Sequence, residues 1–226
     1  MNPDLNILNG TSSASKAVTR FVVIAIISLL AFASANAQQL TTLFASNNNG
    51  SPGGAVYFDA TIGSNALSIT SFDVNTASTM SFSNFQVWIL AGMTSQGHET
   101  SPGWVQVASG SGTGAGTNNP TAVTLSNSFT LNAVTLYGIA LIMDPSAQHF
   151  YTNGTGANQN FSNSDLALSL GSASNIPFTA PIFAPRVWNG TIHYSAVPEP
   201  SAVALLSLGA AGLVFYRRAR RARKLL

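Results

Sequence analysis

The chain has no cysteine and very little charge. Its 226 residues include only nine Lys and Arg residues and seven Asp and Glu residues. Without cysteine, the protein has no disulfide, no thiolate zinc site and no cysteine nucleophile. The absence of disulfides does not exclude export, because a domain of about 160 residues buries enough apolar surface to fold without covalent cross-links.

The few charges are unevenly distributed along the sequence. Between residues 38 and 197, one basic residue, Arg186, stands against five acidic residues, so this region has a net charge of −4. The net charge of +2 of the whole chain therefore comes from its ends. A basic surface for nucleic acid is not expected in the middle of the chain, and we expect no nucleic-acid partner.

Long apolar runs occur only near the two ends, and the first has the features of a secretory signal. Residues 21–32 (FVVIAIISLLAF) follow two basic residues and precede Ala35-Asn36-Ala37, a small-x-small pattern that signal peptidase accepts. We predict a helical signal peptide over residues 1–37, cleaved before Gln38. An uncleaved N-terminal anchor is the alternative, but the run is shorter than the ~20 residues that a membrane span needs.

The second apolar run, residues 201–216, is followed by a dense basic cluster. As a helix, 16 residues reach about 24 Å against a hydrocarbon core of about 30 Å, so this run is a marginal transmembrane helix. By the positive-inside rule the basic cluster stays in the cytoplasm, which stops translocation and leaves the preceding domain outside. The predicted stop-transfer residues are Arg217, Arg218, Arg220, Arg221, Arg223 and Lys224.

A Pro-Glu-Pro motif precedes this run. Pro198 and Pro200 lack an amide donor and disfavour helix at the residue before them, so the backbone at Glu199 is expected to be extended. Extended backbone next to a membrane is a suitable substrate for a membrane-embedded protease.

The order of motif, apolar helix and arginine cluster over residues 197–226 resembles the PEP-CTERM sorting signal. That signal marks substrates of exosortases, transpeptidase-like membrane proteases of bacteria with two membranes and exopolysaccharide systems. The resemblance implies that Pro198, Glu199 and Pro200 form the recognition motif of the exosortase and that the helix and the arginines are removed. It also implies an inner-membrane stage before processing and a mature protein at the cell surface or in the extracellular matrix. An ordinary tail anchor is the alternative.

The middle of the chain has the pattern of an all-β domain. Short stretches with alternating or β-branched residues are separated by Gly, Asn, Ser and Pro, and no window shows a helical apolar face. We predict a single β-sandwich, jelly-roll-like, over residues 38–196, with its last strand ending near Tyr194. The nine predicted strands are residues 40–46, 55–62, 67–74, 85–90, 104–109, 122–131, 134–143, 165–170 and 186–194.

No catalytic constellation is complete. His98-Glu99 begins like a zinc-protease motif, but Pro102 stands where the second histidine is required. No Gly-x-Ser-x-Gly elbow occurs, and His149 and His193 are expected on separate strands as structural residues. Asp59, Asp73, Asp144 and Asp165 could pair as a glycosidase pair or a calcium site, but solvated turn acids are the simpler interpretation. We therefore predict no enzyme, no metal site and no cofactor.

Aromatic residues leave one binding function open. They could form a sugar-stacking face, although aromatic residues on strands are first of all core formers. The prediction is an exported, non-catalytic surface or matrix component; a carbohydrate-binding module for exopolysaccharide is the main alternative, and a polysaccharide-active enzyme is a more distant one. The aromatic candidates are Trp88, Trp104, Trp188, Tyr57, Tyr137, Tyr151 and Tyr194, and the Asn-x-Ser/Thr sequons are Asn49, Asn153, Asn160 and Asn189.

Overall fold

A computed structural model describes residues 37–197, 209–217 and 220. Residues 37–197 form a β domain with fourteen strands in the described part of the chain. The strands are β1 (Ala37–Thr41), β2 (Asn48–Asn49), β3 (Ala55–Ile62), β4 (Ala66–Val74), β5 (Ser81–Ala91), β6 (Val105–Thr113), β7 (Thr121–Leu131), β8 (Leu136–Ile142), β9 (Phe150–Asn153), β10 (Asn160–Ser162), β11 (Leu166–Ser174), β12 (Ile182–Phe183), β13 (Arg186–Trp188) and β14 (Gly190–Val197).

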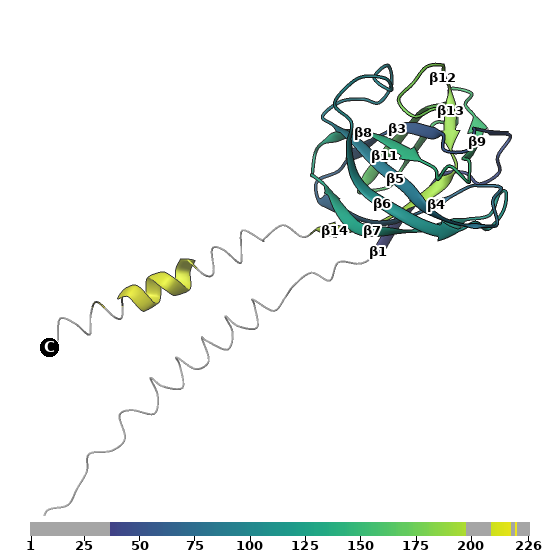
Figure 1. The fold of residues 1–226 in the computed structure, drawn as a ribbon. Coiled ribbons are helices and arrows are strands. Elements are labelled where there is room, and N and C mark those ends of the chain that lie inside the picture. Colours follow the sequence, from purple (N-terminus) through teal and green to yellow (C-terminus); the bar gives the residue numbers. More distant parts are fainter. Residues whose placement is uncertain (1–36, 198–208, 218–219, 221–226) are drawn as a thin grey trace, which may run out of the picture. The chain divides into compact units, whose positions relative to one another are not determined.

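Most strands belong to one antiparallel sheet that curves around a common centre (Figure 1). Its order is β1-β14-β4-β7-β6-β5-β8-β3-β11-β10, with β12 attached to β11. The two ends of this path approach each other, because Asn163 after β10 donates from Nδ2 to the carbonyl of Gln39 in β1 and to the hydroxyl of Tyr194 in β14. The sheet is therefore nearly closed, and side-chain hydrogen bonds span the seam between its edge strands.

The core lies inside this curved sheet. Along β4 the side chains of Leu67, Ile69, Phe72 and Val74 are buried, with one shift of phase at a bulge between Ile69 and Ser71. This alternation is what a strand with one face on the core and one on solvent requires. The small sheet β13-β9-β2 adds Tyr151, Val187 and Trp188 to the same core.

Local patterning predicted the longer strands well. The predicted strand 55–62 is β3 itself, and eight of the nine predicted strands each correspond to one observed strand, whereas 186–194 divides into β13 and β14. Sequence analysis missed the short strands β2, β9, β10 and β12. It also placed the end of the last strand too early, because Ser195, Ala196 and Val197 continue the pairing of β14 with β4.

The all-β class is confirmed, whereas the two-layer, jelly-roll-like sandwich is not. The strands form one nearly closed sheet and a small three-stranded sheet, because alternation identifies the buried face of each strand but does not determine which strands become neighbours.

Outside the sequence of the β domain, residues 209–217 form a short helix. Among the residues that the structure describes, no helix is long and apolar enough to cross a membrane. The predicted signal helix before Ala37 and the first half of the predicted apolar helix 201–216 lie outside the described residues.

Candidate functional site

The predicted sorting motif follows the last strand directly. β14 ends at Val197, which is paired with Ala66 of β4, and Pro198, Glu199 and Pro200 lie outside the described residues. Of the predicted stop-transfer residues, two are described and both are exposed: Arg217 and Arg220. The others lie outside the described residues, namely Arg218, Arg221, Arg223 and Lys224.

The predicted N-terminal cleavage point, before Gln38, lies beside the end of β14. Ala35 is outside the described residues, whereas Ala37 and Gln38 are the first residues of β1. Ala37 is opposite Ser195 and Gln38 is opposite Tyr194 in the antiparallel ladder of β1 and β14. The start of β1 and the end of β14 therefore lie at the same end of the sheet, and cleavage before Gln38 would remove one residue of β1.

The outer face of the sheet carries an aromatic cluster that we call the outer-face patch: Tyr57, Trp88, Trp104 and Phe178. The ring of Phe178 lies 5.3 Å from Trp88 and 5.5 Å from Trp104, and the Tyr57 ring lies 5.9 Å from Trp104, measured between centroids. Tyr57 is buried, and the other three are half-buried. The other four aromatic candidates are buried in the main core: Tyr137, Tyr151, Trp188 and Tyr194.

Two buried carboxylates attach the loop between β5 and β6 to this outer face. Asp59 of β3 accepts hydrogen bonds from the backbone N–H of Ser95 (2.6 Å), from its hydroxyl (2.7 Å) and from the Thr94 hydroxyl. Glu99 accepts a hydrogen bond from the Ser172 hydroxyl of β11 (2.6 Å). A buried carboxylate needs such donors to offset its lost hydration, so these contacts hold the loop against the sheet.

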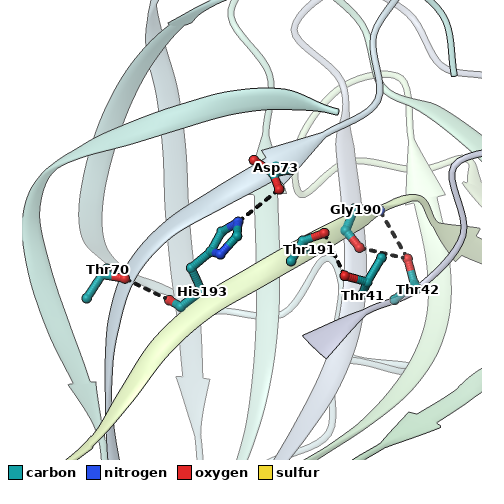
Figure 2. A network of polar contacts seen from close by, with 7 residues as sticks. All are labelled: Thr41, Thr42, Thr70, Asp73, Gly190, Thr191 and His193. Atoms are coloured by element: carbon teal, nitrogen blue, oxygen red, sulfur yellow. Dashed lines mark hydrogen bonds and ion pairs between the residues drawn. The ribbon is translucent and has the colours of Figure 1, made fainter. Parts of the chain in front are cut away.

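Asp73 and His193 form the one ion pair found among the described residues. Figure 2 shows the His193 ring on β14 directed at Asp73 on β4, with 2.8 Å between Nε2 and Oδ2. Thr70 donates to the backbone carbonyl of His193, and the Thr41 and Thr191 hydroxyls bond to each other across β1 and β14. The hydroxyls face neighbouring threonines and backbone rather than the imidazole, so the network ties three strands together without forming a nucleophile–base pair.

The four aspartates do not converge, and two of them are not turn residues. Asp59 is buried on β3 and Asp73 is paired on β4, which corrects the prediction of solvated turn acids at these positions. Asp165 lies in the turn before β11. Within the described ranges, no group of three or more His, Asp and Glu side chains is placed to hold a metal ion.

Asp144 lies in the turn after β8 and organises the backbone around it. Burial would raise the pKa of its carboxyl, but hydrogen bonds from Ser146, Ser83 and Asn84 outweigh burial, and the net pKa is lowered. This carboxylate is thus a structural acceptor for three backbone N–H groups.

His149 is fully buried and lies just before β9, not on a strand as predicted. Its Nε2 is 3.0 Å from the carbonyl of Leu141, and its Nδ1 is buried without a hydrogen-bond partner. Burial lowers the pKa of this imidazole from 6.5 to about 4, more than the hydrogen bond to Leu141 raises it. The folded domain therefore holds His149 neutral at neutral pH.

This burial predicts an acid-labile fold. Between pH 6.5 and about 4, the unfolded chain binds a proton at residue 149 that the folded domain does not bind. The contribution of neutral His149 to the free energy of unfolding is therefore fully present above pH 6.5. The free energy of unfolding should fall by roughly 2–3 kcal/mol on acidification to pH 4.5. Urea unfolding of residues 38–197 at a pH above 6.5 and at pH 4.5 measures this loss of stability. His149→Gln keeps a donor for Leu141 but does not titrate, and it should lose less stability over the same interval; equal losses in both proteins would contradict the prediction.

The sequons differ in accessibility. Asn49, Asn153 and Asn160 are exposed, whereas Asn189 is fully buried and accepts a hydrogen bond from Thr152. Asn189 is therefore a structural residue that a glycosyltransferase cannot reach in the folded domain.

Sequence reasoning missed several residues that build the outer face. It treated Glu99 only as part of an incomplete zinc motif, and it gave no role to Ser95, Ser172 or Phe178. The signal was weak because their partners lie far away in the sequence: Glu99 and Ser172 are 73 positions apart.

Comparison with known proteins supports the prediction for the tail. The family model of the PEP-CTERM protein-sorting motif matches residues 196–221. The match begins at the last two residues of β14 and contains Pro198, Glu199 and Pro200. No curated protein matches the chain.

Proposed function

We propose that this protein is a non-catalytic component of the cell surface or extracellular matrix, delivered there by a C-terminal sorting signal. The match of the PEP-CTERM motif to residues 196–221 carries the proposal. In general this motif implies export, a membrane-anchored stage and processing by an exosortase. The β domain would be the cargo, and the apolar helix with the arginine cluster would be the part that is removed.

The charge pattern explains how the tail would work. A marginal apolar run followed by six basic residues halts in the inner membrane with the basic residues in the cytoplasm. The Pro-Glu-Pro motif would then lie at the outer surface of this membrane, next to the exosortase. Signal peptidase would act at the other end, before Gln38.

Mass spectrometry of the native protein tests this proposal. Mature protein from surface fractions should begin at Gln38 and yield no peptide that covers Arg217 to Lys224. Cells that lack the exosortase should retain the same peptides in the inner-membrane fraction. An intact C-terminus in the mature surface fraction would refute the sorting proposal.

Carbohydrate binding is the second candidate function, and the outer-face patch favours it. Trp88 and Trp104 are half-buried, and both lie on the outer side of the sheet. Exposed indole faces suit stacking on sugar rings. Against this function, Phe178 already packs against both tryptophans, with interplanar angles of 68° and 41°, and the rings do not form a flat row.

Binding to the cell's own exopolysaccharide separates the two functions. If the patch binds sugar, residues 38–197 should be retarded in affinity gels that contain this polysaccharide, and Trp88→Ala with Trp104→Ala should weaken retardation at least tenfold. Met80→Ala is a matched control, because Met80 is exposed outside the patch. Equal mobility with and without polysaccharide would favour the purely structural function. Release of new reducing ends would instead support the enzyme alternative.

A further inference from the structure

The end of the β domain from which the tail leaves is defined by three neighbouring strands. β14 ends at Val197, opposite Ala66 at the start of β4, and Leu67 is opposite Leu131 at the end of β7. Neighbouring strands lie about 4.8 Å apart, so Val197 lies within roughly 10 Å of the turn that follows β7. We call this region the exit end: the loop 63–66, the turn 132–135 and Val197.

Chain length keeps the exit end close to the apolar run of the tail. Pro198, Glu199 and Pro200 alone separate Val197 from Ser201, where that run begins. Four extended Cα–Cα steps cover at most about 14 Å. If the run enters a bilayer, the exit end cannot lie far above the headgroups.

Val134, at the tip of this turn, is unusual in two independent respects. Its side chain is 82% exposed, which is the largest exposed fraction among the large apolar residues of the β domain that the structure describes. Its backbone has a φ of 53°, a left-handed conformation that is unfavourable for a β-branched residue and that Gly or Asn adopts more easily. Its N–H donates to the carbonyl of Gly63, which holds the tip in place. Inside the domain, nothing accounts for a valine at this position.

The surroundings of Val134 suit a lipid surface. None of the residues 63–66 (GSNA) and 132–135 (NAVT) is charged. The nearby acid is Asp165, whose carbonyl accepts the Gly63 N–H and whose carboxylate accepts a long hydrogen bond of 3.4 Å from Tyr194. An uncharged rim with one protruding apolar side chain can enter the interfacial region at little desolvation cost.

We propose that the exit end rests on the surface of the inner membrane while the tail is still attached, with Val134 inserted among the lipid headgroups. This inference rests on the proposed function, because it requires the tail to be in the bilayer. The contact would hold β14 and the adjoining Pro-Glu-Pro motif at a fixed height over the membrane, where a membrane-embedded protease acts.

The absence of native cysteine permits a direct test with single-cysteine variants of the full chain in phosphatidylethanolamine–phosphatidylglycerol vesicles. A polarity-sensitive fluorophore at Val134→Cys should emit at shorter wavelength and be quenched at least threefold less by aqueous iodide than the same fluorophore at Met80→Cys. Met80 is the matched control, because it is exposed beside the start of β5, at the opposite end of the strands. Stopping the chain after Val197 should return position 134 to the behaviour of position 80.

A third position separates this proposal from the proposed function. A fluorophore at Leu213→Cys, within the apolar run, reports whether the tail is in the bilayer. Protection at 213 with full quenching at 134 would overturn the contact at the exit end and leave the sorting function standing. Full quenching at position 213 would contradict both the contact at the exit end and the proposed sorting function.

The stability of the turn supplies an independent check. Val134→Asn suits the left-handed backbone and should raise the melting temperature of residues 38–197 by a few °C, because Asn adopts this conformation at a lower cost than a β-branched residue. A lower melting temperature would show that the valine serves the fold, and it would overturn the proposal.

Discussion

Deleting residues 198–226 should leave the melting temperature of the β domain within about 2 °C of its value in the longer protein. The same deletion should completely change the cell fraction in which the protein accumulates. β14 ends at Val197 and the core lies within residues 37–197, so the deletion removes no strand and no core side chain. The truncated protein retains its signal peptide but loses the proposed sorting address. It should accumulate as a soluble periplasmic species, which thermal unfolding and cell fractionation measure separately.

Transfer of the tail provides the complementary experiment. Residues 197–226 fused to an unrelated exported reporter should route the reporter to the surface in a host with an exosortase and leave it in the inner membrane in a host without one. Identical fates in both hosts would place the address elsewhere in the chain. A fall in melting temperature of more than about 5 °C on deletion, worth roughly 1–2 kcal/mol for a domain of this size, would show that the tail is part of the fold.

Replacing Trp188 by alanine should destabilise the β domain severely, because this large side chain is buried in the main core. The indole is 1% exposed, stacks on Phe58 with 5.0 Å between ring centroids and meets the edge of Phe72 at 6.2 Å. Truncation of a buried tryptophan removes its apolar contacts and leaves a cavity, which typically costs about 3–5 kcal/mol. The melting temperature of residues 38–197 should therefore fall by roughly 10–15 °C, measured by circular dichroism.

Two variants test whether stacking is the cause. Trp188→Phe keeps a ring against Phe58 and removes an indole N–H that has no hydrogen-bond partner, so it should cost less than half as much as alanine. Gly190→Ala should be severe by a different route, because its Cβ would come within 2.2 Å of the Trp188 ring and 2.4 Å of the Asp73 carbonyl. If Trp188→Phe were as damaging as Trp188→Ala, the stacked ring would not be the stabilising feature.

The sorting signal and the longer strands depend on residues that are neighbours in the chain, so the sequence alone predicted them. A sorting signal is recognised as a linear segment, so the order of Pro-Glu-Pro, apolar run and arginines could be recognised without knowledge of the fold. The family model confirms this sorting signal at residues 196–221. Strands such as β4 and β7 could be predicted in the same way, because alternation of side chains along a strand is a local consequence of a pleated backbone.

Only the tertiary structure determined which distant segments of the chain contact each other. The sheet nearly closes because Asn163 reaches Gln39, 124 positions away, and no local pattern encodes that meeting. Glu99 was interpreted as part of an incomplete motif and Asn189 as a sequon, yet both are buried, because donors on other segments satisfy their oxygens. The physical reason is the same in each case: a period of two determines which face of a strand avoids water, whereas closure of the sheet and burial of polar groups depend on hydrogen-bond partners that folding brings together.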